Sequence, residues 1–486
     1  MTGAVMTSLV RAVLASQDLD PSGRLSPREA STLPDLAAPS KTSVLEAVDP
    51  SSPTEVFHGY LGVFVVAFLV SVCATPIMRH LAVTHGVVDK PLEARKLHRV
   101  PVAYLGGVAV FLGMLAGIAF SYFGITMPES IYAIHESRFD QKVVPVSVVL
   151  GMTVIMLTGL IDDVVGLAPR VKVGGQLLAA AALAMQDVGT KVAANVMKPI
   201  GALIGNQSLV FDITLPFALP MIAPGGTLQF DLVYWIGTAI IAVFVLGACN
   251  ATNLIDGLDG LCSGLTAIAA GALLVVGLML AASDDGPLDS TRVVLAMAIL
   301  GACLGFLPHN FNPATIFLGD CGSLMLGYMT ILLVLTLGDT GKTHLVVAGL
   351  IIYAIPIIDT SLAIVRRKMA GKPLSAPDDQ HLHHMLKRAL GVKGAVFTLY
   401  GIATLFAVLG VMMTMWRMRI VFTLALVVAA FIGVTAVKLA RRKVLEEKML
   451  ALHGHAPAVA GAASGPAVPP SAAAKHPPGQ PDPARV

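Results

Sequence analysis

Long apolar runs separated by short polar segments fill the chain from about residue 57 to residue 440. A helix needs about 20 mostly apolar residues to cross the hydrocarbon core of a bilayer. The pattern therefore predicts an all-α polytopic membrane protein with about eleven transmembrane helices. Their expected ranges are 57–78, 104–123, 145–161, 173–187, 233–250, 264–282, 292–308, 323–338, 345–365, 394–415 and 420–439.

Composition agrees with that pattern. Hydrophobic residues make up 55% of the 486 residues and charged residues only 13%, against about 25% charged in a typical soluble domain. So little polar surface excludes a soluble particle of this size. The five cysteines lie in or beside apolar runs without a CxxC pair, so no disulfide framework or zinc site is predicted.

Basic residues set the expected orientation, because cytoplasmic loops are enriched in Lys and Arg. Three basic clusters follow odd-numbered helices, at 79–99, 366–388 and 438–443. The turn Trp416–Arg419 carries two arginines on the opposite side, but one dibasic turn does not outweigh three clusters. We therefore expect an extracytoplasmic N-terminus and a cytoplasmic C-terminus.

Three regions follow from this assignment. Residues 1–55 form a polar, Pro- and Ser-rich extracytoplasmic tail, and residues 56–445 form the membrane domain. Residues 446–486 have too few bulky apolar side chains to build a core and are predicted to be a disordered cytoplasmic tail.

Four loops on the predicted cytoplasmic face carry carboxylates, amides or histidines. Acidic groups near hydrocarbon are costly unless they are paired, hydrated or metal-bound. Each motif alone has an ordinary explanation, such as a helix cap, a turn or a solvated surface, but four on one face predict a shared active site. They are GLIDD with Asp162 and Asp163, NATNLIDGLDGL with Asn250, Asn253, Asp256 and Asp259, NPATIFLGDCGS with Asp320, and HLHH with His381, His383 and His384.

The spacing within the second motif suggests a metal site. Asn253, Asp256 and Asp259 recur every three residues, which would place them on one face of a helical segment. Their oxygen atoms suit Mg²⁺, which binds few protein ligands and keeps water or substrate phosphate as the others. Such an ion would neutralise a pyrophosphate, and Lys172 and Arg367 could hold further phosphate oxygens.

The motifs together resemble a known family. A further segment, Asp-Lys-Pro … His … Pro … Gly-Gly from Asp89 to Gly107, precedes the four loops. Residues 57–440 then resemble the polyprenyl-phosphate N-acetylhexosamine 1-phosphate transferases of glycosyltransferase family 4, which include the WecA- and TagO-like enzymes and MraY. The resemblance implies transfer of a HexNAc 1-phosphate from a UDP-sugar to undecaprenyl phosphate, with release of UMP, as the start of cell-envelope polysaccharide synthesis.

The resemblance also implies residue roles. Metal ligands would be Asp320 and Asn253, with Mg²⁺ as cofactor and Mn²⁺ as an alternative. Catalytic residues would be Asp162, Asp163, Asp256, Asp259 and His381. Substrate-binding residues would be Lys172, Asn250, Arg367, His383, His384, Lys90 and His98. Direct attack by the acceptor phosphate is favoured over a phospho-enzyme, because a phosphate already ionised near pH 7 hardly needs a carboxylate nucleophile.

The sugar depends on the histidine loop. His381-Leu382-His383-His384 resembles the GlcNAc-type branch, whereas MraY-type enzymes more often show three consecutive histidines. The GlcNAc-type branch commonly has Asp-Arg before the motif, whereas this chain has Asp378-Asp379. GlcNAc is therefore the predicted sugar, with another HexNAc such as GalNAc, or MurNAc-pentapeptide, as alternatives.

The remaining expectations concern location and partners. The protein is expected to be multi-pass in the bacterial inner (plasma) membrane. Its expected partners are the UDP-N-acetylhexosamine, the polyprenyl phosphate and membrane lipids, with no nucleic acid, and a homodimer stays open. Two other function classes are a transporter and an inactive scaffold. The acids lie at helix ends rather than midpoints, against the transporter, and every motif acid is present, against the scaffold.

One N-terminal segment matches a different pattern. Residues 18–29, DLDPSGRLSPRE, fit the 12-residue EF-hand loop, with glycine at position 6 and a glutamate at position 12. Two interpretations stay open, a weak Ca²⁺ site and an unstructured tail, because EF-hands usually work in pairs and only one loop is visible. The candidate Ca²⁺ ligands are Asp18, Asp20, Ser22, Arg24 and Glu29.

Overall fold

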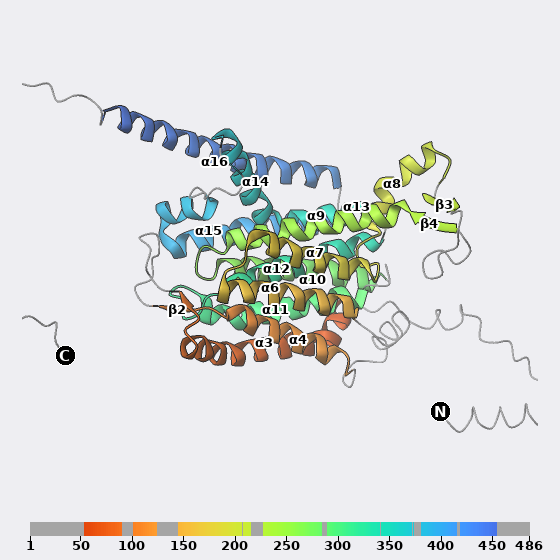
Figure 1. Cartoon of the computed structure of the whole chain (residues 1–486), viewed down its shortest axis with the longest axis horizontal. Helices are drawn as coiled ribbons and strands as arrows, with labels where there is room; N and C mark the ends of the chain where they lie inside the picture. Colours follow the sequence, from red (N-terminus) through yellow and green to blue (C-terminus); the bar gives the residue numbers. More distant parts are fainter. Residues whose placement is uncertain are drawn as a thin grey trace, which may run out of the picture. The chain divides into compact units, whose positions relative to one another are not determined.

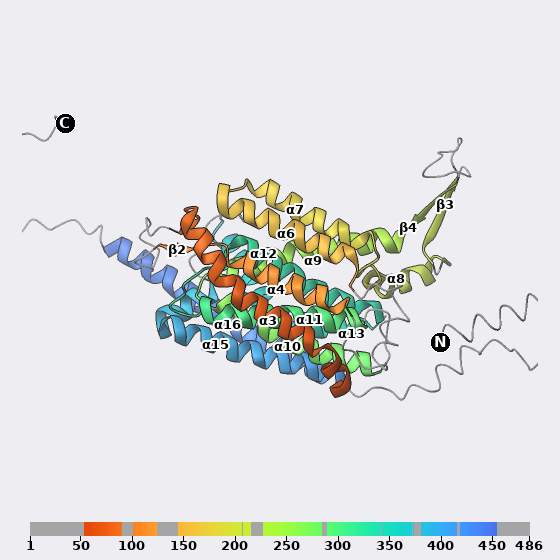
Figure 2. The same cartoon turned by 90° about the horizontal axis from the view of Figure 1, so that it is seen from below.

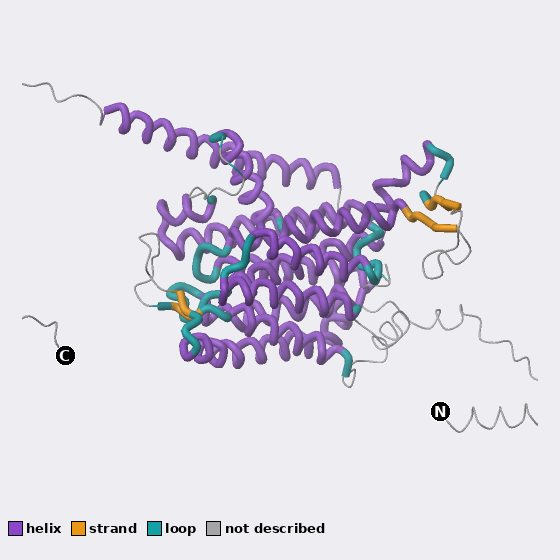
Figure 3. Tube along the Cα trace, in the orientation of Figure 1, coloured by secondary structure: helices purple, strands orange, loops and turns teal. Residues whose placement is uncertain are grey.

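The computed structural model describes most of the membrane domain. Almost all of it is helical (Figures 1 and 3), which confirms the all-α polytopic membrane class. The described residues are 53–89, 101–123, 144–206, 208–214, 227–283, 289–340, 342–371, 373, 381–415 and 418–453.

Thirteen α-helices lie within these residues, with a short 3₁₀ helix at Leu337–Thr340. Their bounds are α3 Pro53–Thr84, α4 Gly106–Ser121, α6 Val146–Val165, α7 Pro169–Ala184, α8 Val192–Leu203, α9 Leu232–Ile255, α10 Leu261–Ala282, α11 Asp289–Asn310, α12 Gly319–Thr336, α13 Thr343–Ile352, α14 Ala354–Met369, α15 Leu382–Met415 and α16 Met418–His453.

Each of the eleven predicted segments overlaps a helix, but the count of eleven spans is not confirmed. Within the described residues, eight helices are long and apolar enough to cross a membrane, or nine if the bent pair α13 and α14 is one span. Helix α4 is apolar but short, and α7 is not among these spans. The pair α13–α14 bends by 77°, where the sequence predicted one continuous helix over 345–365.

Helix α12 is the centre of the packing. It contacts α4, α6, α9, α10 and α11, and its apolar stretch is completely buried. Small residues permit this close approach: a Cβ on Gly107 of α4 would lie 2.2 Å from the Gly322 backbone nitrogen, and one on Gly327 would lie 2.5 Å from the Ala248 carbonyl oxygen of α9. Asp320, in the first turn of this helix, is therefore held by a rigid core.

Two antiparallel hairpins lie at different ends of the helices (Figure 2). Strands β1 (Val88–Asp89) and β2 (Val102–Ala103) pair near the acidic loops, and β3 (Val210–Thr214) pairs with β4 (Thr227–Asp231) just before α9. The sequence prediction contained neither hairpin, nor helix α8. Their strands are only two to five residues long, too short to stand out from a membrane-protein pattern.

The two chain ends lie largely outside the described residues. The EF-hand-like loop 18–29 does so entirely. The chain divides into two compact units, Met1–Gly433 and Val434–Val486. In the second unit helix α16 extends to His453, past residue 446 where the tail was predicted to start, because the charged stretch RRKVLEEKMLALH contains only residues that are favourable or neutral in a helix.

Candidate active site

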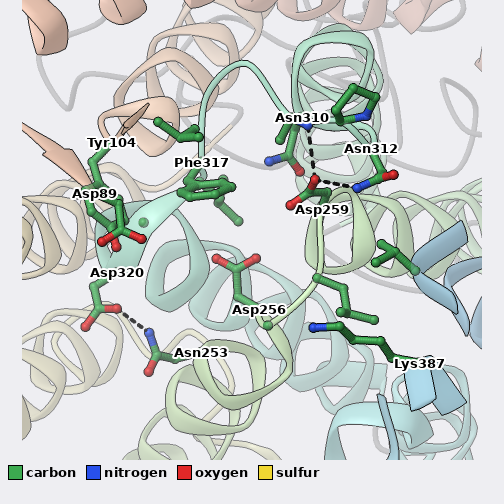
Figure 4. Close-up of a pocket in the computed structure, with 18 of the residues that line it drawn as sticks. Asp89, Tyr104, Asn253, Asp256, Asp259, Asn310, Asn312, Phe317, Asp320 and Lys387 are labelled. Atoms are coloured by element: carbon green, nitrogen blue, oxygen red, sulfur yellow. Dashed lines mark hydrogen bonds between the residues drawn. The ribbon is translucent and has the colours of Figure 1, made fainter. Parts of the chain in front are cut away.

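A cavity of ≈ 500 Å³ lies where several helix ends meet. Residues of the Asp89–Gly107 segment, of the NATNLIDGLDGL motif, of the NPATIFLGDCGS motif and of the first part of α15 surround it (Figure 4). Of the predicted site residues, five line it, namely Asn253, Asp256, Asp259, Asp320 and His384. The same cavity is lined by Asp89, Tyr104, Asn310, Asn312 and Lys387, which the sequence analysis did not assign.

Lys172 joins two of the predicted carboxylates beside this cavity. Its Nζ donates to Asp320 Oδ2 at 2.9 Å and lies 2.5 Å from Asp162 Oδ2. Burial alone would lower the pKa of Lys172, but its hydrogen bonds to these carboxylates outweigh burial and raise that pKa. Asp162 also accepts from the Leu167 N–H at 2.7 Å, which ties the end of α6 to the start of α7.

Asp163 makes a different contact from its neighbour. Its Oδ1 accepts from the Asp320 N–H at 2.8 Å and its Oδ2 from the Cys321 N–H at 3.0 Å. It thus satisfies two of the N–H groups left open at the start of α12. Gly319 has φ +73°, and a Cβ there would lie 2.6 Å from Asp163 Oδ2. Both the backbone and the space at this turn therefore require glycine.

The expectation of one helical face for the second motif is wrong. Helix α9 ends at Ile255, Asp256 is its C-cap residue, and Gly260 adopts φ +77° before α10. The three side chains reach the same cavity through this turn instead (Figure 4). Asn253 Nδ2 donates to Asp320 Oδ1 at 2.8 Å and to Ser323 Oγ at 3.0 Å. Asp259 Oδ2 accepts from Asn312 Nδ2 at 2.8 Å and from the Ala314 N–H at 3.1 Å.

Asp256 stands between these two bonded pairs (Figure 4). Burial raises its pKa to about 8, and the negative charges of Asp320, Asp163 and Asp259 add to the shift. The acids on the cavity wall (Asp89, Asp256, Asp259 and Asp320) outnumber the one lysine, Lys387. The cavity is therefore electronegative and favours a cation.

The segment from Asp89 to Gly107 joins the site through backbone pairing. The Phe317 N–H donates to the Ala103 carbonyl at 2.8 Å, and the Gly106 N–H donates to the Phe317 carbonyl at 3.0 Å. This pairing brings Tyr104 and Asp89 to the cavity. Burial, and then the charge of Asp89, raise the pKa of Tyr104 above its usual value. Lys90 and His98 of the same motif lie outside the described residues.

The histidine loop divides into buried and cavity-facing members. His381 and His383 are buried, at 5% and 1% exposure, and only His384 lines the cavity. His381 Nδ1 lies 2.9 Å from Asp359 Oδ2. Arg367 lies in the last turn of α14 and Asn250 bonds Gln176 of α7 at 3.0 Å; neither lines the cavity.

Sequence signals existed for some of the residues that were missed. Asp89 and Asn312 each begin one of the motifs of the family resemblance, but the resemblance implied no role for them. Asp359 is the only charged residue in the predicted span 345–365, and an ionisable group inside a span indicates function by default. Tyr104 and Lys387 carried no comparable signal, because their place at the cavity depends on tertiary pairing.

Comparison with known proteins identifies the family. Residues 145–338 match the family Glycosyl transferase family 4. The chain is 31% identical to the probable undecaprenyl-phosphate N-acetylglucosaminyl 1-phosphate transferase of Bacillus subtilis (strain 168), over 76% of this chain and 91% of that protein. It is 31% identical to the decaprenyl-phosphate N-acetylglucosaminephosphotransferase of Mycolicibacterium smegmatis, over 77% and 87%. A phospho-N-acetylmuramoyl-pentapeptide-transferase of Bacillus cytotoxicus is 29% identical, over 72% and 96%.

These likenesses extend over most of each protein. The chain belongs to glycosyltransferase family 4, within the polyprenyl-phosphate N-acetylhexosamine 1-phosphate transferases. The family resemblance inferred from the five motifs is thereby confirmed, and the protein is a multi-pass membrane transferase.

Proposed function

We propose that this enzyme transfers N-acetylglucosamine 1-phosphate from UDP-GlcNAc to undecaprenyl phosphate and releases UMP. The observation that carries the proposal is the convergence of Lys172, Asp162 and Asp320 from three helices beside one electronegative cavity. The printed names of the Bacillus subtilis and Mycolicibacterium smegmatis relatives support the donor sugar and the lipid class.

Mg²⁺ fits the donor set of this site. Asp320 and Asn253 are hydrogen-bonded to each other, and both bonds from the Asn253 amide use Nδ2, so its carbonyl oxygen is the atom available to a cation. Hard oxygen ligands of this kind suit Mg²⁺ rather than a thiophilic metal. Asp320 and Asn253 would hold the ion, and Asp256 would contribute charge once the neighbouring cation lowers its raised pKa. When bound, the ion neutralises pyrophosphate charge and assists departure of UMP.

The chain's own residues would bind and orient the two phosphates. Lys172 is a long cation held beside the cavity by two carboxylates, and it would exchange one of these contacts for a phosphate oxygen of the substrate. Asp163 would orient Asp320 by accepting the two N–H groups at the start of α12. Asp162 would orient Lys172 and, through it, the acceptor phosphate.

Chemistry by direct displacement needs no covalent enzyme intermediate. An oxygen of undecaprenyl phosphate attacks the phosphorus that bears the sugar, and the bond from that phosphorus to the bridging oxygen of UMP breaks. The products are the lipid-linked pyrophosphoryl sugar and UMP. Asp163 is poorly suited to act as a nucleophile, because both its oxygens accept backbone hydrogen bonds.

We further infer that the site faces the cytoplasm of a bacterial inner membrane, with the N-terminus outside and the C-terminus inside. The basic clusters that follow odd-numbered helices support this orientation. UDP-sugars are water-soluble, so a cytoplasmic site would also give the donor access to the cavity.

A panel of UDP-sugars tests the proposal. Purified enzyme with undecaprenyl phosphate and Mg²⁺ should release UMP fastest from UDP-GlcNAc, with UDP-GalNAc as the nearest competitor. Turnover of UDP-MurNAc-pentapeptide without turnover of UDP-GlcNAc would assign the chain to the branch of the Bacillus cytotoxicus relative and overturn the proposed sugar. No UMP release from any donor would overturn the reaction itself.

A further inference from the structure

A buried carboxylate stands behind the histidine loop. Asp359 of α14 is 1% exposed and uses both carboxylate oxygens. Oδ2 lies 2.9 Å from His381 Nδ1, and Oδ1 accepts from the Leu382 N–H at 2.7 Å. One side chain therefore fixes the imidazole of His381 and the first backbone N–H of helix α15.

The second buried histidine links this carboxylate to the cavity wall. His383 Nδ1 lies 3.7 Å from the same Asp359 Oδ2, and its ring stacks on His381 with centroids 5.5 Å apart. On its other side, a Cβ on Gly257 would lie 2.4 Å from His383 Nε2. Gly257 follows Asp256 directly and lines the cavity, so His383 rests against the acidic turn.

Contact continues to the one histidine that reaches the cavity. The ring centroids of His383 and His384 are 4.2 Å apart, and His384 lines the cavity beside Lys387. An unbroken series of contacts thus runs from Asp359 through His381 and His383 to His384. The two inner histidines are buried and do not line the cavity, so in this conformation they cannot touch a substrate there.

We infer that Asp359 is a positioning residue, which acts through His381 and His383 to hold His384 and the Asp256–Asp259 turn in place at the substrate cavity. The inference rests on the proposed function only in taking this cavity as the donor site. Carboxylates behind a histidine commonly fix its tautomer and ring orientation. Here the carboxylate also anchors the backbone that starts the histidine helix.

A metal site is the competing explanation for the same three side chains. The candidate ligand atoms of Asp359, His381 and His383 lie within 4.8 Å of one another. Yet Asp359 Oδ1 accepts from the Leu382 N–H and Oδ2 is at hydrogen-bond distance from His381 Nδ1. Direct hydrogen bonding satisfies this carboxylate, which favours positioning over ligation.

Histidine footprinting with diethyl pyrocarbonate tests the inference without relying on catalysis. In the wild-type protein, His381 and His383 should be protected and exposed His85 should react fully. In Asp359→Asn, reactivity of His381 and His383 should rise toward that of His85. Asp289→Asn is the matched control, since Asp289 is equally buried, at 2% exposure, but lies in a different ion pair. Unchanged protection in Asp359→Asn would overturn the inference.

A double-mutant cycle with His384→Ala supplies the functional test. Alone, Asp359→Asn should lower kcat/KM for the UDP-sugar by up to about 100-fold, as misplacement of site groups by about 1 Å can do. In the His384→Ala background, the further loss should be far smaller, because residues acting through one contact are not additive. Equal fold losses in both backgrounds would show that Asp359 does not act through His384 and would overturn that part of the inference.

Two further measurements complete the test. Gly257→Ala should lower kcat/KM in the same way, because the added methyl group displaces His383. If the wild-type chain bound one transition-metal ion and Asp359→Asn bound none, these three side chains would form a metal site and the positioning role would be overturned. If the wild type releases no UMP, the proposed function fails, while the footprint still decides the role of Asp359.

Discussion

Charged side chains lie at both ends of α11 and α12, fully buried at one end and partly exposed at the other, and their partners differ. At one end Asp289 and Arg292 pair at 2.5 Å, with exposures of 2% and 1%. Arg292 also donates through Nε and Nη2 to the Thr336 carbonyl at 3.2 Å and 2.7 Å. This ion pair is neutral as a whole and it satisfies a carbonyl at the C-terminus of α12.

At the other end the charges do not balance. Asp162 and Asp320 share Lys172, and burial beside other acids raises the pKa of Asp256 to about 8. With that pKa Asp256 is mostly protonated at neutral pH, which avoids the cost of an uncompensated buried charge, and a bound cation would favour its ionised form. The paired end therefore supports the structure, whereas the proposed function assigns the acidic end to a cation and to phosphates.

The largest expected effect is that of Asp320→Asn. The amide keeps the size of the side chain but removes the charge that would hold the metal and pair with Lys172. We expect the rate of UMP release to fall by about 1,000-fold, the upper range for loss of one electrostatic contact in an active site. Size-exclusion chromatography in detergent should show folded protein. A rate near that of the wild type would remove Asp320 from the site.

A smaller loss is expected for Asp163→Asn. An amide can accept only one of the two N–H groups at the start of α12 and turns a donor toward the other. Hydrogen bonds to charged groups contribute about 1.5–3 kcal/mol, so kcat should fall by roughly 100-fold. Asp163→Glu should recover little, because Gly319 packs closely on the carboxylate. Full activity in Asp163→Asn would contradict the orienting role.

Lys172→Met should cost less, about 10-fold in kcat/KM, because the lysine is 28% exposed and solvent screens part of its charge. Lys172→Arg retains the charge and should recover part of the activity. The loss should appear in steady-state kinetics with varied UDP-sugar. No loss in Lys172→Met would show that this lysine only neutralises Asp162 and Asp320.

Asp289→Asn should separate stability from activity and have the smallest effect on turnover. Removing one partner of a buried pair costs about 3–5 kcal/mol of unfolding free energy, so thermal unfolding should shift to lower temperature. Activity per folded enzyme should stay within about twofold, because distant sites act independently. A large fall in activity without loss of stability would break the distinction between the two ends.

The sequence predicted what depends on local pattern. Apolar runs located the helices, and five ordered motifs located the family and most of the acids. The break at Tyr353 was not predicted, although Pro356 in the first turn of α14 signals it: proline cannot donate to the preceding turn and disrupts a continuous helix. The apolar residues on both sides concealed this signal, and tertiary contacts also hold the bend. Tyr353 bonds to Thr252 and, at 3.2 Å, to the Ala248 carbonyl of α9.

Roles that depend on contacts between distant segments were also not predictable. The pair Asp162-Asp163 reads as two equivalent acids, yet one contacts Lys172 and the other caps α12. Asp359 lies 22 residues before His381 and inside an apolar run, so only the folded chain shows that they meet. The family resemblance could not supply these roles, because they follow from packing around α12 and α14.

We propose that the unbalanced acids bind a divalent cation during transfer. UMP release from UDP-GlcNAc, with purified enzyme and undecaprenyl phosphate, tests it most directly when measured after treatment with EDTA and then during titration with Mg²⁺. We predict no release after EDTA, full recovery with Mg²⁺ in the wild type and in Asp289→Asn, and no recovery in Asp320→Asn. A full rate after EDTA, or recovery in Asp320→Asn equal to the wild type, would contradict the account.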